Sequence, residues 1–131
     1  MKITCHCENI SLEFNQEVDE IKPLTECNCT ICRRIGALWF GFEPSEVVIT
    51  SKTESTVAYL RPAGELAFHH CPKCGCTTHY ETTEICSMNK IAINGRLLDM
   101  KDRAKIKVNK FDGATSWKFV DEWPENLNIE T

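Results

Sequence analysis

The sequence has 131 residues, of which 42% are hydrophobic and 26% charged, and its formal net charge is -4 at pH 7. This length accommodates one domain with a real core, so residues 1–131 are expected to form a single domain, and the ordinary composition excludes intrinsic disorder. The acidic balance argues against a nucleic-acid partner, because such partners select clustered Lys and Arg. A local basic run from Lys101 to Lys110 is more typical of a solvated strand or turn edge than of a phosphate-binding patch.

Short strands separated by turns are predicted along most of the chain. Residues 9–15 alternate apolar and polar side chains with the period of a half-buried strand. Further strands are predicted at residues 38–42, 47–50, 57–60 and 90–93, the last followed by a turn at Asn94-Gly95. A short helix or turn fits at residues 84–88 and 97–103, and residues 117–126 are predicted to hold a strand and a turn at Pro124. Because no segment carries a long helical period, the sequence predicts a mainly β domain.

Cysteine content is the unusual feature of the composition, with nine cysteines in the chain. No stretch has the length and apolarity of a membrane span. The first residues, Met1 to Cys5, lack the apolar core of a signal peptide, so we expect a cytoplasmic protein that is not bound to a membrane. Disulfides are rare in that compartment, and an odd number of cysteines cannot pair completely within one chain. The cysteines are therefore interpreted first as metal ligands.

Two of the three cysteine clusters are predicted to share one structural zinc. In Cys71-Pro72-Lys73-Cys74-Gly75, the glycine can adopt positive φ and direct its N–H at a thiolate, while the turn presents two sulfurs to one ion. A second pair comes from the Cys-X-Cys near the N-terminus. Four thiolates saturate a tetrahedral zinc, which is the usual arrangement of a structural site. The predicted ligands of this zinc are Cys5, Cys7, Cys71 and Cys74.

The remaining cluster is predicted to bind a second zinc through Cys27, Cys29 and Cys32, which a tight turn brings to one side. Three protein ligands leave a tetrahedral ion one ligand short, and an open position of this kind is typical of catalytic zinc. Water or a substrate would occupy the fourth position. The alternatives are Cys76, as a fourth ligand to either ion, and His69 or His70. It also stays open whether some of the thiols are only small buried hydrophobic side chains, or whether a single zinc ribbon uses four of them.

The order of these motifs resembles one known family. Cys-X-Cys, Cys-X-Cys-X-X-Cys-Arg-Arg, Cys-Pro-X-Cys-Gly and then Asn94-Gly95-Arg96-Leu97-Leu98-Asp99 are similar to the glutathione-dependent formaldehyde-activating enzyme and centromere protein V domain family, over nearly the whole chain. The resemblance implies a β-tent fold with two zincs per chain, bound by the same two ligand sets. It also implies an activity of the carbon-sulfur lyase class, the joining of glutathione to formaldehyde to give S-hydroxymethylglutathione.

The candidates for binding the substrate follow the second cluster and are Arg33, Arg34 and Gly36. Arg33 and Arg34 could pair with the two carboxylates of glutathione, because guanidinium groups match carboxylates in shape and charge. Solvent-exposed turn charges are the alternative interpretation of these arginines. Gly36 would allow close approach of the backbone to a ligand, or it is only a turn residue.

The sequence thus favours an enzyme that adds a thiol, glutathione or similar, to formaldehyde or another small aldehyde. The alternative is a non-catalytic binding module in which both zincs are structural. A thiol redox or metal-buffer protein, with Cys76 and Cys86 as extra reactive thiols, is a third interpretation. The identity of the thiol and the aldehyde stays open, as does the oligomeric state.

Overall fold

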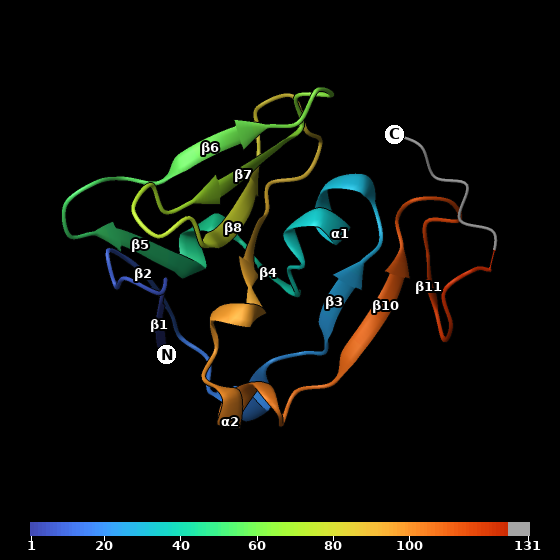
Figure 1. Ribbon diagram of the computed structural model, residues 1–131, viewed down its shortest axis with the longest axis horizontal. Coiled ribbons are helices and arrows are strands. Elements are labelled where there is room, and N and C mark those ends of the chain that lie inside the picture. Colours follow the sequence, from blue (N-terminus) through green and yellow to red (C-terminus); the bar gives the residue numbers. More distant parts are fainter. Residues whose placement is uncertain (126–131) are drawn as a thin grey trace.

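The computed structural model describes residues 1–125, and these residues form two β-sheets (Figure 1). The strands are Lys2–Thr4 (β1), Ile10–Phe14 (β2), Leu24–Cys27 (β3), Trp39–Phe42 (β4), Val47–Ser51 (β5), Val57–Leu60 (β6), Leu66–His70 (β7), Thr77–Thr82 (β8), Ile91–Asn94 (β9), Val108–Asp112 (β10) and Lys118–Val120 (β11). The smaller sheet has the order β1-β2-β5, and the larger has the order β11-β10-β3-β4-β9-β8-β7-β6. All neighbouring pairs of described strands are antiparallel except β10 and β3. The prediction of a mainly β protein is therefore confirmed.

Helices are short in the described part of the chain. They are Thr30–Ile35 (α1) and Met100–Arg103 (α2), with 3₁₀ turns at Val18–Glu20, Pro44–Glu46 and Gly95–Leu97. Helix α1 was not predicted, because six residues are too few to show a helical period. Its ends are nevertheless well defined: the sulfur of Cys29 accepts a hydrogen bond from the Cys32 N–H, and Gly36 ends the helix with φ of 74°. The predicted tight turn in the second cysteine cluster is thus a strand end followed by a capped helix.

The other predicted elements are mostly confirmed. The strands predicted up to residue 93 correspond to β2, β4, β5, β6 and β9. The region 97–103 contains the end of a 3₁₀ turn and α2. Residues 84–88 form turns and bends, and the predicted C-terminal segment contains β11, while Asn126 lies outside the described residues. No strand was predicted at β1, β3, β7, β8 or β10. Their sequences are short or polar, as in the Thr-Thr-His-Tyr-Glu-Thr of β8, and only pairing with neighbouring strands makes them extended.

The two faces of the central strands β4 and β9 contribute to two different cores. One face carries Phe40, Phe42 and Ile93, which pack with apolar side chains of the smaller sheet. The other face carries Trp39 and Ala92, which pack against cysteines of α1 and of the segment before it. Figure 1 shows β4 in the centre, with β1, β2 and β5 on one side and β3, β10 and β11 on the other. Burying a side chain as large as Ile or Phe contributes about 1.5–3 kcal/mol to stability. This packing holds the two sheets together, and the sheets in turn position the loops between their strands. No helix within residues 1–125 is both long and apolar enough to cross a membrane.

Candidate metal centres

Two loops distant in sequence bring four cysteines together, and we call this group the four-cysteine cluster. Its members follow β1 or lie in the turn between β7 and β8: Cys5, Cys7, Cys71 and Cys74. The four sulfurs all lie within 4.8 Å of one another. The Sγ atom of Cys7 is 3.7 Å from that of Cys5 and 3.6 Å from that of Cys71. Four convergent thiols are the donor set that suits a tetrahedral zinc ion.

Backbone N–H groups already point at these sulfurs. The N–H of Ile10 donates to Cys5 Sγ at 3.3 Å, and the N–H of Lys73 donates to Cys71 Sγ at 3.4 Å. Burial raises the pKa of Cys5 to about 12. Burial also acts to raise the pKa of Cys71, but N–H donors around its sulfur outweigh burial and lower the pKa overall. The predicted positive φ of Gly75 is confirmed at 76°, although its N–H donates to the Cys71 carbonyl oxygen instead of a sulfur.

Asn9 supports the four-cysteine cluster, and this role was not predicted. Its side chain is buried, and its Nδ2 donates to the carbonyl of Glu54 at 2.8 Å and lies 3.6 Å from Cys71 Sγ. Its Oδ1 accepts hydrogen bonds from both the N–H and the hydroxyl of Thr53. Asn9 therefore connects the cluster to the loop after β5. Its position two residues after Cys7 is the only signal for this role in the sequence.

The second group, which we call the three-cysteine cluster, comes from one continuous segment. Its members are Cys27 at the end of β3, Cys29 at the start of α1 and Cys32 within α1. Their sulfurs lie within 4.8 Å of one another. The N–H of Cys29 donates to Cys27 Sγ at 3.4 Å, and the indole Nε1 of Trp39 donates to Cys32 Sγ at 3.3 Å. The capped start of α1 thus sets the mutual orientation of the three sulfurs.

The three thiols share their protons unequally. Hydrogen bonds from Cys27 and then from Cys32 lower the pKa of Cys29 far below its ordinary value. Hydrogen bonds to the other two sulfurs, together with burial, raise the pKa of Cys32, and the hydrogen bond with Cys29 raises that of Cys27. A bound cation would replace the protons of these thiols, because metal binding to thiols releases protons.

A turn after β10 supports the loop that carries the three-cysteine cluster. Asn28 is buried, and its Nδ2 donates to Asp112 Oδ1 at 2.8 Å. Asp112 also accepts from the hydroxyl of Ser116 at 2.7 Å, and the hydrogen bonds from Asn28 and Ser116 lower its pKa. A Cβ atom on Gly113 would lie 2.6 Å from Cys27 Sγ, so only glycine fits there without displacing the sulfur. No pattern in the sequence pointed to a metal-related role for Asn28, Asp112 or Gly113.

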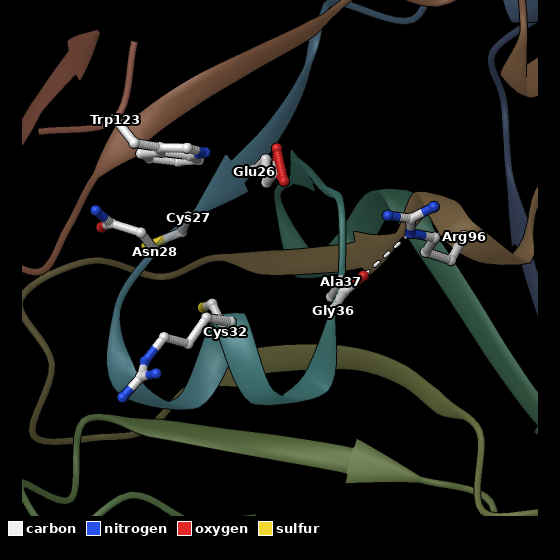
Figure 2. A pocket seen from close by; sticks show the side chains of 9 residues that line it. Glu26, Cys27, Asn28, Cys32, Gly36, Ala37, Arg96 and Trp123 are labelled. Carbon is white, nitrogen blue, oxygen red and sulfur yellow. Dashed lines mark hydrogen bonds between the residues drawn. The ribbon is translucent and has the colours of Figure 1, made fainter. Parts of the chain in front are cut away.

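Two sulfurs of the three-cysteine cluster line a cavity of about 210 Å³ (Figure 2). Figure 2 shows Trp123 beside Cys27 on one side of this cavity and Arg96 on the other, where its Nε donates to the carbonyl of Gly36 at 3.1 Å. The complete lining is Glu26, Cys27, Asn28, Cys32, Arg33, Gly36, Ala37, Arg96 and Trp123. Four of these residues were predicted as site residues from the sequence: Cys27, Cys32, Arg33 and Gly36. Arg96 and Trp123 were not, because the fold brings them from distant segments.

Arg34 and the alternative fourth ligands lie elsewhere. The guanidinium of Arg34 donates to the Thr30 carbonyl at 2.8 Å, and Arg34 does not line the cavity. Within residues 1–125, neither cysteine cluster includes Cys76, His69 or His70 among its close ligand atoms. Cys76 lies two residues after Cys74 of the four-cysteine cluster, and burial and then this neighbour raise its pKa. His69 belongs to a separate group of side chains.

A mainly β domain that gathers seven cysteines into a group of four and a group of three belongs, by fold and donor set, to the cysteine-rich proteins suited to zinc binding. The model of the family described as glutathione-dependent formaldehyde-activating enzyme matches residues 1–113. The chain therefore belongs to this family.

Comparison with solved structures supports the fold. A crystal structure of a Rhodobacter sphaeroides protein, determined by structural genomics, is similar to this chain with a TM-score of 0.62 and 22% sequence identity. The similarity covers 82% of this chain and 99% of the other. Among curated proteins, none matches the sequence. At this level of identity the structural neighbour supports the arrangement of strands and carries no argument about chemistry.

Proposed function

We propose that the protein is a zinc enzyme that adds a thiol, glutathione or a similar molecule, to formaldehyde or another small aldehyde. The observation that carries the proposal is that the three-cysteine cluster has one thiol fewer than a tetrahedral zinc requires and lies against a cavity. Cys27 and Cys32 line this cavity, and charged and aromatic side chains complete its wall. In the four-cysteine cluster Cys5 and Cys71 are buried and Cys7 is exposed, but its four thiols already suffice for a tetrahedral zinc. Membership of the family supports this chemistry.

In this proposal each cluster holds one zinc ion, and only the three-cysteine cluster takes part in the reaction. The four-cysteine cluster supplies all the ligands that a structural zinc requires. The three-cysteine cluster supplies one ligand fewer, and its sulfurs are already held by N–H donors in one orientation. When bound there, zinc favours the thiolate form of a thiol substrate, because thiol pKa values fall next to a cation.

The addition needs little more than positioning. The thiolate sulfur forms a bond to the carbonyl carbon, the π bond of the aldehyde breaks, and its oxygen takes up a proton to give a hemithioacetal. A cavity of about 210 Å³ suits the thiol end of a peptide together with a one-carbon aldehyde. Holding both in contact converts a bimolecular encounter into an intramolecular step, which supplies much of the rate.

The charges around the cavity match those of glutathione. Glutathione carries two carboxylates and one ammonium group. Arg33 and Arg96 present positive charge at the cavity, and Glu26 presents negative charge. Guanidinium groups bind carboxylates with paired hydrogen bonds, so we assign Arg33 the role of carboxylate anchor. Trp123 offers an apolar wall beside Cys27.

The test is a measurement of zinc per chain, followed by zinc-edge X-ray absorption during titration with glutathione. We expect about two zincs per chain and one additional sulfur neighbour at one of them when glutathione binds. S-methylglutathione is the matched control, because it has the same charges but no free thiol, and it should leave the sulfur count unchanged. Consumption of formaldehyde, followed in parallel, tests turnover. If both zincs are saturated by protein sulfur and glutathione changes nothing, the protein is a binding module with two structural zincs.

A further inference from the structure

A third group of metal-binding side chains lies away from both cysteine clusters. It consists of His69 on β7 and of His79 and Glu81 on β8, and their ligand atoms lie within 4.8 Å of one another. The Nε2 atom of His69 is 2.9 Å from Oε1 of Glu81, and the Nε2 atom of His79 is 3.6 Å from the same oxygen. The imidazole rings are stacked, with centroids 4.3 Å apart and planes 13° apart. Two imidazole nitrogens therefore lie beside one carboxylate oxygen, and an ion bound by both nitrogens requires the two parallel rings to tilt toward each other.

Strand pairing fixes this arrangement. His69 and His79 are direct partners across the antiparallel pair β7 and β8. Glu81 follows His79 by two residues, so it lies on the same face of the sheet, and its own partner on β7 is the small Ala67. Side chains at such positions are neighbours because of backbone register, and they do not depend on a mobile loop.

The Nδ1 nitrogen of each ring lies within hydrogen-bond distance of a threonine hydroxyl group. Thr56 Oγ1 lies 2.8 Å from Nδ1 of His69, and Thr78 Oγ1 lies 2.8 Å from Nδ1 of His79. Both Nε2 atoms are thereby directed at the carboxylate. Histidines that bind metals usually have the second ring nitrogen engaged in this way, because the hydrogen bond fixes the tautomer and the ring orientation.

The accessibility of the group suits a small ion. The side chain of His79 is 1% exposed and that of His69 is 16% exposed, whereas that of Glu81 is 43% exposed. The base of the group is thus closed and one ligand faces solvent, which provides an entry path. Phe68 and Tyr80 alternate with these residues along β7 and β8, and they pack with Trp39 on the opposite face of the sheet. The group is therefore separated by the sheet from the three-cysteine cluster.

We propose that His69, His79 and Glu81 form a third metal site, which binds a divalent first-row transition ion such as Zn²⁺ through two imidazole nitrogens and one carboxylate oxygen. Ligand sets of two histidines and one carboxylate suit zinc and related ions, and leave positions for water. An ion in this site connects β7 with β8 next to the turn that carries Cys71 and Cys74. Occupancy should therefore stabilise the folded protein by mass action.

The test uses protein with both cysteine clusters already loaded with zinc and freed from excess metal. Further Zn²⁺ is added while calorimetry records binding and long-range ¹H–¹⁵N spectra record the histidine ring nitrogens. We expect one more zinc per chain and shifts of Nε2 in His69 and His79, with the ring of His70 unchanged. If no further zinc binds, or if it binds without moving these two rings, the proposal is wrong. The readout needs neither glutathione nor activity, so its failure is distinct from failure of the proposed enzyme function.

Three variants sharpen the test. Glu81→Gln keeps the size of the side chain and removes the carboxylate charge, and Thr56→Val removes only the hydroxyl behind His69. Loss of an outer partner usually weakens metal binding about 10–100-fold, and loss of a ligand should weaken it at least as much. His70→Gln is the matched control, because His70 neighbours His69 in sequence but does not belong to the group. Equal zinc affinity of Glu81→Gln and the unmodified protein would overturn the proposal. Because this conclusion requires folded protein, each variant's thermal melt is recorded first. If a variant fails to fold, the ring shifts of the unmodified protein decide whether the proposal holds.

Discussion

The four-cysteine and three-cysteine clusters contain the same chemical groups but are built in different ways. The first joins two turns, and Cys7 and Cys71 lie 64 positions apart in the chain. The second lies within six consecutive residues and faces a cavity through Cys27 and Cys32. A cluster that connects distant segments restricts the unfolded chain, whereas a local cluster does not. We infer that the first cluster maintains the fold and that the second one performs the chemistry.

The largest effect is expected from Cys71→Ser. Removing one of four ligands should release the metal of the four-cysteine cluster and collapse the cooperative thermal melt, since a structural zinc contributes directly to folding. A cross-link that closes a loop of this length restricts the unfolded chain by about 4 kcal/mol. Circular dichroism melts and zinc content measure both effects. Cys86→Ser is the control, because Cys86 belongs to neither cluster. A normal melt for Cys71→Ser would remove the structural role of this cluster.

Cys29→Ser should separate chemistry from folding. Serine is a good residue at the start of a helix, so α1 should keep its cap while the three-cysteine cluster loses a sulfur. We expect activity to fall by about a hundredfold or more, because a metal supplies several kcal/mol of transition-state stabilisation. The melting temperature should change by only a few degrees. Loss of folding comparable to that of Cys71→Ser would mean that both clusters are structural.

Gly113→Ala tests the support of the second cluster without touching a ligand. The added methyl group would clash with Cys27 Sγ at 2.6 Å, so we expect zinc affinity at this cluster to fall about 10–100-fold, as for other outer-sphere changes. Competition with a chelator measures this affinity. Gly41→Ala is the matched control: its new methyl group meets the flexible end of Lys90, which can move away. If both variants bind zinc like the unmodified protein, the turn after β10 does not position Cys27.

The smallest effect is expected from Arg33→Gln. Losing one charged hydrogen bond to a substrate carboxylate should raise KM for glutathione about tenfold and leave kcat nearly unchanged. Arg34→Gln provides the comparison, since Arg34 already donates to the Thr30 carbonyl and does not line the cavity. Steady-state kinetics of both variants give the result. Equal values of KM for the two variants would contradict the assignment of Arg33 as the carboxylate anchor.

The sequence predicted the elements whose signals are local. Alternating side chains marked β2, and the spacing of the cysteines predicted the two groups of thiols that the fold brings together. It could not predict β8 or β10, because polar strands become extended only when neighbours pair with them. It also presented Arg33 and Arg34 as equivalent. Only the path of α1 separates them, with Arg33 at the cavity and Arg34 bonded along the helix.

By itself, the sequence determined that this is a cysteine-rich protein with thiol groups suited to a metal ion. The thiolate ligand favours soft metals such as zinc, and the spacing of the cysteines limits how many ligands each turn supplies. The tertiary structure decided which cysteines are accessible and which side chains support the loops that carry them. It buried Cys71, opened Cys27 to a cavity, and brought Asn28 against Asp112 across 84 positions of chain. It also aligned His69 with His79 through strand register. Such long-range neighbours arise from packing and pairing, and no local pattern in the sequence specifies them.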